Sequence, residues 1–109
     1  MNSWEIIITP EAAKDIRDIY SYIADTLLDP GAARRQVLRI LETVHSLEYM
    51  PMRYALYEKE PWHSRGLRKA GAGKFLIFYL PKEASEEVVI FHVLYGGRNI
   101  EQILNENSP

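Results

Sequence analysis

The residues best suited to chemistry lie between positions 63 and 98. They comprise five cations, two histidines and two tyrosines, namely Arg65, Arg68, Lys69, Lys74, Arg98, His63, His92, Tyr79 and Tyr95. The five cations are candidates for binding an anion or a nucleic acid. Cleavage of RNA without a metal needs such cations to hold the charge on phosphorus, together with a base and an acid. The function therefore depends on which of these side chains the fold brings together.

Arg98 is a candidate for close contact with an anion, because it follows Gly96 and Gly97 at a predicted strand end. A guanidinium in that place could bind a phosphate with two parallel hydrogen bonds. The same fork suits a carboxylate equally well, so a salt bridge from Arg98 to an acid of the N-terminal helices is the alternative.

His92 and Tyr95 lie in the apolar stretch that runs from position 88 to position 95. The period of two places His92 on the face of Ile90 and Leu94, and Tyr95 on the other face with Phe91 and Val93. We expect a core histidine at position 92. Tyr95 ends the strand, where its hydroxyl could reach a ligand. It would act as a base only if nearby cations lowered its pKa.

The charges of the chain are unevenly distributed. The net charge is −2, but the stretch between Pro61 and Pro81 carries four cations and no acid, so the remainder carries −6. This separation indicates one anion-seeking face on an acidic body. The alternative is a strand edge whose cations discourage pairing with other sheets.

Several classes of protein are excluded by what the sequence lacks. There is no phosphate-binding loop, dinucleotide fingerprint, zinc-ligand spacing or nucleophile elbow, so we expect no cofactor and no metal. The absence of cysteine excludes disulfides. No signal-like or membrane-spanning stretch occurs, which predicts a cytoplasmic protein. The 109 residues fit a single domain over 1–109, with a frayed tail at about 105–109.

The first half of the chain predicts a strand and two helices. Trp4 to Thr9 is short and β-branched, and Thr9 followed by Pro10 marks a helix start. Apolar residues at helical spacing then continue to position 27. Asp29 followed by Pro30 repeats the start signal, and the second helix must end before Pro51. The two helices should form an antiparallel hairpin.

The second half predicts three strands joined by turns. Residues 50–63 should form a loop, 64–70 a strand, 71–73 a glycine turn, 74–80 a strand and 88–95 a central strand covered on both faces. Asn99 could cap a short last helix. The fold class is therefore α+β, with a small antiparallel sheet of the N-terminal strand plus a three-strand meander, packed by the N-terminal helical hairpin.

This order of elements, with Leu67-Arg68, Phe75 to Pro81 and Val88 to Ile100, resembles the RelE/ParE superfamily of type II toxin–antitoxin toxins. The most specific piece is the ending Tyr95-Gly96-Gly97-Arg98-Asn99. The resemblance implies a growth-inhibiting toxin that forms a hetero-oligomer with a cognate antitoxin. The resemblance also implies that such a toxin acts either on DNA gyrase or on the ribosome with its mRNA, and that no membrane is involved.

The two branches of the superfamily imply different roles for the site. A RelE-like metal-independent endoribonuclease implies catalytic roles for Lys74, Tyr95 and Arg98. The stretch from Leu76 to Pro81 is similar to ParE-like members, and position 74 holds lysine where RelE nucleases often have arginine. The ParE-like action on gyrase is therefore favoured. An inactive, toxin-like module that only binds a partner is a further alternative. We expect acids of the antitoxin to meet Arg65 and Arg68.

Overall fold

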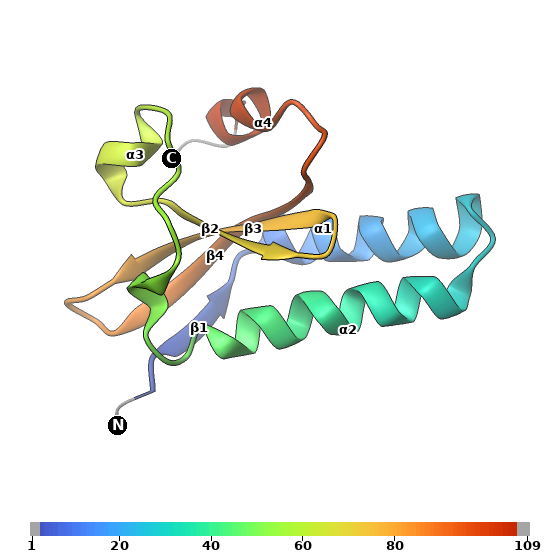
Figure 1. Ribbon diagram of the computed structural model, residues 1–109, viewed down its shortest axis with the longest axis horizontal. Coiled ribbons are helices and arrows are strands. Elements are labelled where there is room, and N and C mark those ends of the chain that lie inside the picture. Colours follow the sequence, from blue (N-terminus) through green and yellow to red (C-terminus); the bar gives the residue numbers. More distant parts are fainter. Residues whose placement is uncertain (1–2, 107–109) are drawn as a thin grey trace.

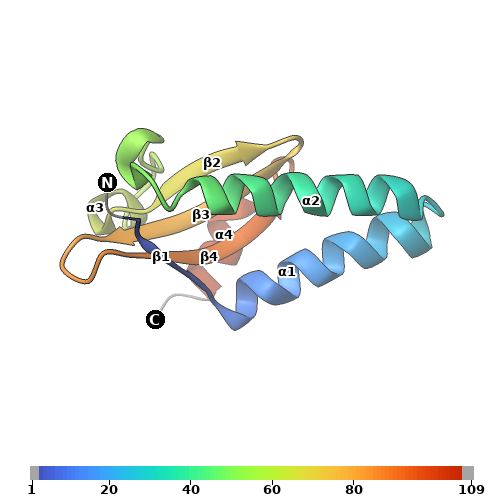
Figure 2. The same ribbon diagram turned by 90° about the horizontal axis from the view of Figure 1, so that it is seen from below.

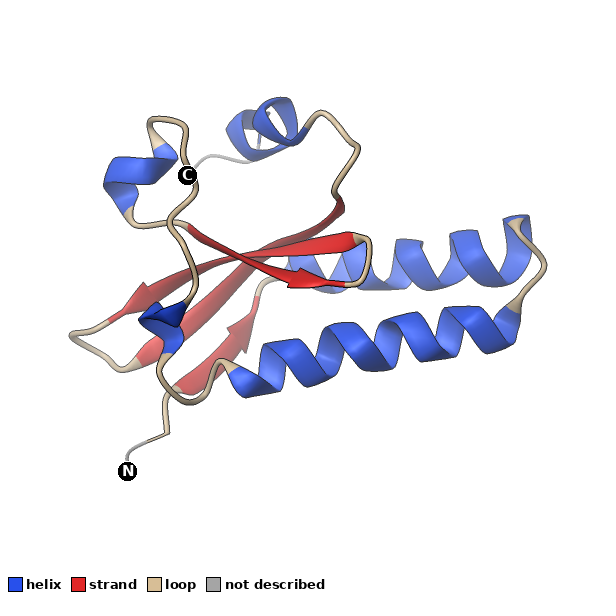
Figure 3. Ribbon diagram, viewed as in Figure 1, coloured by secondary structure: helices blue, strands red, loops and turns tan. Residues whose placement is uncertain are grey.

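The structure, a computed structural model, describes residues 3–106. In chain order the elements are β1 (Glu5–Ile8), α1 (Pro10–Ser21), a π-helical turn (Tyr22–Thr26), α2 (Pro30–Ser46), a 3₁₀ turn (Pro51–Arg53), α3 (Trp62–Arg65), β2 (Arg68–Ala72), β3 (Phe75–Lys82), β4 (Glu87–Tyr95) and α4 (Ile100–Glu106). The strands form one sheet in the order β1-β4-β3-β2 (Figures 1 and 3). The α+β class and the central place of β4 are as predicted.

The sheet has helices on both faces. The α1–α2 hairpin covers one face, and the shorter α3 and α4 cover the other (Figure 1). Ile40, Val44, Ile77 and Ile90 belong to the core under the hairpin. The second core includes Trp62, Leu67, Phe78, Phe91 and Leu104. Burial of apolar side chains on both faces stabilises the sheet and fixes which way each residue of β4 points.

The direction of β1 differs from the prediction. The meander β2–β3–β4 is antiparallel as expected, but β1 pairs with β4 in parallel, from Glu5 opposite Glu87 to Ile8 opposite Ile90. The sheet is therefore mixed. A parallel pair needs a long crossover connection, which the hairpin and the meander supply. Alternation within β1 does not depend on the direction of its neighbour, so the sequence pattern could not reveal it.

The hairpin begins as the sequence predicts. The amide of Ala12 donates to Thr9 Oγ1 at 3.1 Å, and the amide of Ala32 donates to Asp29 Oδ1 at 3.0 Å. Each cap satisfies a backbone donor that would otherwise lack a partner within its helix. The first helix changes after Ser21 into the π-helical turn, so it is not regular up to position 27 as expected.

The second predicted strand was misplaced. Residues 62–65 form α3, which ends at Gly66 with a φ of +87°, and β2 begins only at Arg68. A left-handed glycine is a common helix end. Gly71 and Ala72 belong to β2, and the turn into β3 depends on Gly73, whose φ is +64°. The loop predicted at 50–63 contains the 3₁₀ turn and the start of α3.

The end of the chain is more ordered than predicted. Asn99 Oδ1 accepts a hydrogen bond from the amide of Gln102 at 3.3 Å, as expected of a cap for α4. Asn105 and Glu106, part of the predicted frayed tail, are helical, and Trp62 Nε1 donates to Asn105 Oδ1 at 2.9 Å. Residues 107–109 lie outside the described residues. Within 3–106, none of the helices has the length and apolar character needed to cross a membrane.

Candidate functional site

Three of the predicted site residues meet at one end of the sheet. Tyr95 lies opposite Phe75 in the β3–β4 register, with the two rings edge to face at 5.9 Å. The amide of Gly96 donates to the carbonyl of Lys74 at 3.0 Å, and the amide of Arg98 donates to the carbonyl of Tyr95 at 3.1 Å. Lys74, Tyr95 and Arg98, which we call the strand-end site, are thus brought together by backbone contacts.

The strand-end site is open to solvent. Lys74 and Arg98 are exposed, and Tyr95 is 46% exposed. Neither cation forms a salt bridge with any residue from 3 to 106, so the alternative pairing of Arg98 with a hairpin acid is not observed there. A side chain at Gly97 would place its Cβ 2.7 Å from Tyr95 Cε2. Glycine at this position therefore lets the tyrosine ring lie against the backbone.

The other three cations lie away from this site, around the opposite end of β2. Arg68 Nη1 donates to the carbonyls of Met52 at 3.0 Å and Tyr54 at 2.6 Å. Lys69 Nζ bonds Glu58 Oε2 at 2.9 Å, and this hydrogen bond lowers the pKa of the Glu58 carboxyl. The Arg65 guanidinium lies over the Trp62 ring at 5.0 Å. The basic segment therefore splits into a strand-end part and a part that contacts the segment from 52 to 62.

A β-bulge interrupts the pairing of β4 with β3 before Tyr95. Phe78 of β3 lies opposite His92 and Tyr79 lies opposite Ile90, which leaves Phe91 as an extra residue. The peptide groups around such a bulge lose their ladder partners. β1 cannot supply new ones, because its register with β4 ends at Ile90.

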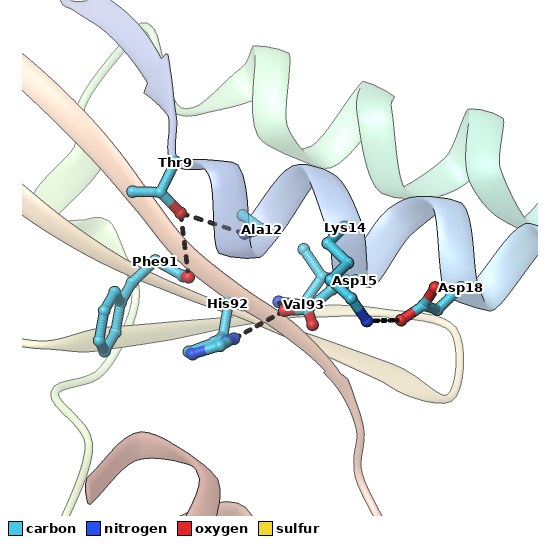
Figure 4. Close-up of polar contacts among 8 residues, drawn as sticks. All are labelled: Thr9, Ala12, Lys14, Asp15, Asp18, Phe91, His92 and Val93. Atoms are coloured by element: carbon cyan, nitrogen blue, oxygen red, sulfur yellow. Dashed lines mark hydrogen bonds and ion pairs between the residues drawn. The ribbon is translucent and has the colours of Figure 1, made fainter. Parts of the chain in front are cut away.

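Side chains at the start of α1 satisfy these peptide groups instead (Figure 4). Thr9 Oγ1 donates to the carbonyl of Phe91 at 3.2 Å. Asp15 Oδ2 accepts the amide of Val93 at 3.0 Å and contacts His92 Nδ1 at 2.7 Å. The N-cap Thr9 and the helical residue Asp15 thus bind the backbone of β4, so α1 holds the strand just after its bulge.

Because of the bulge, the predicted assignment of β4 side chains to the two faces of the sheet was wrong after Phe91. Val93 joins Ile90 in the core under the hairpin, and Leu94 joins Phe91 in the second core. The extra residue shifts the period of two by one, which the sequence pattern could not show. His92 is buried, with 3% of its surface exposed, as expected of a core histidine, but it is paired with a carboxylate. Its Nε2 is buried without a hydrogen-bond partner among the described residues.

The two remaining candidates do not contribute to the strand-end site. His63 lies on α3, with Nδ1 4.0 Å from Glu60 Oε2. Tyr79 is fully buried, and its hydroxyl donates to the carbonyl of Pro51 at 2.6 Å. No group of three or more metal-ligating side chains with suitable placement occurs among residues 3–106.

Because of Tyr79, we expect the free energy of unfolding to fall as the pH rises above 10. Burial is the main cause that raises the pKa of Tyr79 from 10.0 to about 12. The contribution of the neutral phenol is therefore complete below pH 10 and is lost as the pH rises through 12. Between these values we expect the free energy of unfolding to fall by about 2 kcal/mol more in the wild type than in Tyr79→Phe. Urea denaturation of both proteins would measure this, and parallel pH curves would contradict it.

Comparison with known proteins identifies the family. The model of the family described as "ParE toxin of type II toxin-antitoxin system, parDE" matches residues 6–100. The chain belongs to the ParE toxin family. This matched region contains β1 except Glu5, the hairpin, the complete meander and all residues of the strand-end site. No curated protein sequence matches the chain.

Solved structures of toxin–antitoxin systems share the fold of this ParE-family chain. It is similar to a chain of the chromosomal ParDE system from Pseudomonas aeruginosa, with a TM-score of 0.69, 24% identity and coverage of 85% of this chain and 96% of that one. It is also similar to a chain of the RelBE2 complex from Mycobacterium tuberculosis, with a TM-score of 0.67, 18% identity and coverage of 90% and 97%. A chain of the archaeal RelE–RelB complex from Pyrococcus horikoshii is similar as well, with a TM-score of 0.59, 18% identity and coverage of 88% of this chain and 98% of that one.

For this ParE-family chain, sequence reasoning missed Asp15 and Thr9 as partners of β4. Thr9 was predicted only as a helix cap, a role that it also has. Asp15 is not one of the apolar residues at helical spacing in α1, yet its carboxylate contacts β4. The sequence signal that could have pointed to Asp15 was the single histidine, His92, within an apolar strand, because a buried imidazole needs a polar partner.

Proposed function

We propose that this toxin inhibits growth by binding DNA gyrase through the strand-end site, and that it does not cut RNA. The observation that supports this is the composition of the site, which has two cations without carboxylate partners among residues 3–106. Cleavage of RNA needs both a base and an acid. None of the three site residues is a histidine or a carboxylate, and His92 is buried against Asp15. The site therefore suits binding better than acid–base catalysis.

We further propose a cognate antitoxin as the partner that keeps the toxin inactive in the cytoplasm. An acidic segment that folds on binding could meet Lys74 and Arg98 and cover Tyr95. The sequence-based expectation was that these acids meet Arg65 and Arg68. We propose the strand-end cations instead, because Arg68 Nη1 already donates to two carbonyls and the Arg65 guanidinium lies over the Trp62 ring. A complex of toxin and antitoxin would then be a hetero-oligomer.

Two assays with the purified chain test the target. We expect loss of supercoiling by DNA gyrase on a relaxed plasmid, and no new cleavage sites in translated mRNA by primer extension. The meeting of Tyr95, Lys74 and Arg98 is the observation that favours a RelE-like nuclease as the second candidate. Cut mRNA with unaffected supercoiling would establish that candidate and overturn the first. Normal growth of bacteria that express folded chain without antitoxin would indicate an inactive binding module.

A further inference from the structure

The ring of Tyr95 in the strand-end site contacts both β3 and the turn that follows β4. Phe75 packs against the core under the hairpin, and its ring meets the Tyr95 ring edge to face at 5.9 Å. The β2–β3 turn lies beside the end of β4 in both views (Figures 1 and 2). After Tyr95 the chain turns back, because the amide of Arg98 donates to the carbonyl of Tyr95 at 3.1 Å. This turn brings the backbone of Gly97 against the tyrosine ring.

The backbone conformation of Gly97 does not require glycine. The glycines with a left-handed φ among residues 3–106 are Gly66 and Gly73, so alanine could adopt the backbone of Gly97 without that strain. The space beside it is the restriction. A Cβ at position 97 would lie 2.7 Å from Tyr95 Cε2, 3.3 Å from Cδ2 and 3.6 Å from Cζ. Since carbon atoms in contact lie about 3.5–4.0 Å apart, a side chain here would overlap the ring.

An alanine at position 97 would displace the ring of Tyr95 and leave the fold intact. Tyr95 is the last residue of β4 and is 46% exposed, so its ring can rotate into solvent. The ring would then lose its contact with Phe75. The backbone hydrogen bonds of Gly96 and Arg98 around the turn need no side chain and would remain. The residue at position 97 therefore determines the orientation of the ring.

We propose that Gly97 is a positioning residue, which keeps the Tyr95 ring in the orientation that the target binds. This inference rests on the proposed function, because it takes Tyr95 to be part of the surface that contacts the target. A ring that is fixed before binding loses little conformational freedom in the complex, whereas a mobile ring must first be immobilised. Tyrosine is also one of the residues on which the affinity of protein interfaces most often depends. Gly97 thus strengthens binding through Tyr95.

Gly97→Ala tests whether the glycine sets the orientation of the ring. We expect nuclear Overhauser effects between the ring protons of Phe75 and Tyr95 in the wild type, and their loss in Gly97→Ala. Gly71→Ala is the matched control and should keep them. Gly71 is also exposed and has no left-handed φ, but a Cβ added there meets no atom within 4 Å. The thermal unfolding temperature of Gly97→Ala should fall by no more than about 5 °C.

Inhibition of gyrase tests whether this orientation matters for the target. The concentration of toxin that halves supercoiling should rise about tenfold in Gly97→Ala and stay unchanged in Gly71→Ala. In a Tyr95→Ala background, Gly97→Ala should have no further effect, because no ring is left to displace.

Three results would overturn the inference. They are ring contacts that survive in Gly97→Ala, lost ring contacts with unchanged inhibition, and an equal effect of Gly97→Ala with and without the Tyr95 ring. A wild type that fails to inhibit gyrase would instead contradict the proposed target. Growth arrest of bacteria that express the chain, which assumes no particular target, then replaces supercoiling in the same comparison. Equal arrest by the wild type and Gly97→Ala would again overturn the role of Gly97.

Discussion

Replacing Asp15 by alanine is expected to lower the free energy of unfolding by about 3 kcal/mol. The substitution leaves the Val93 amide and His92 Nδ1 without the acceptor that they share, at 3.0 Å and 2.7 Å respectively. His92 is almost fully buried, so water cannot replace the carboxylate without opening the contact between α1 and β4. Urea denaturation of the two proteins at neutral pH measures the difference.

Asp18 provides the matched control for Asp15 on the same helix. Its carboxylate contacts Lys14 Nζ at 2.7 Å, but its side chain is 62% exposed. Surface pairs of this kind contribute little, so Asp18→Ala should cost less than about 0.5 kcal/mol. Equal losses from the two alanine substitutions would mean that Asp15 acts only through the general charge of α1. The bulge would then not depend on its carboxylate.

Replacing Arg98 by alanine should reduce gyrase inhibition about 30-fold, provided that the strand-end site binds the target. A hydrogen bond to a charged group contributes about 2 kcal/mol, which corresponds to this factor. The concentration of toxin that halves supercoiling is the measurement. Since the Arg98 side chain is exposed and forms no salt bridge within residues 3–106, the thermal unfolding temperature should stay unchanged.

Two further variants show whether the effect belongs to the guanidinium. Arg98→Lys keeps the charge but loses the planar fork, so it should recover only part of the inhibition. Lys82→Ala removes an equal charge from the exposed end of β3, at the opposite end of that strand from Phe75, and should have little effect. If Arg98→Ala and Lys82→Ala lowered inhibition equally, net charge alone would account for the result.

The local features of this fold were predictable from the sequence. Thr9-Pro10 and Asp29-Pro30 mark both long helices because a cap needs only its own residues and the next turn. The apolar run from 88 to 95 identified the central strand for the same reason. The closeness of Tyr95, Gly96 and Arg98 was also predictable, since they adjoin one another in the chain, whereas their role in a site stays a prediction.

The features that could not be predicted from the sequence depend on contacts between residues that are far apart in the chain. Arg68 looked like an anion-binding residue, and only its position beside the carbonyls of Met52 and Tyr54 shows its structural role. The bulge at Phe91 moves half of β4 to new faces, although nothing in the local pattern marks it. Asp15 and His92 are 77 positions apart, so their pairing could be inferred only from the buried position of the histidine.

The parallel pairing of β1 with β4 has a consequence for the time at which the toxin becomes complete during synthesis. Glu5 can pair only after Glu87 has been made. Thr9 can form its hydrogen bond only after Phe91, which is 82 positions further along the chain, has been made. Contacts of such long range form late, after the intervening chain has been made. A nascent or truncated chain that ends before β4 therefore lacks two of the three strand-end residues, Tyr95 and Arg98. If the strand-end site binds the target as we propose, a growing chain cannot bind it before β4 has been made.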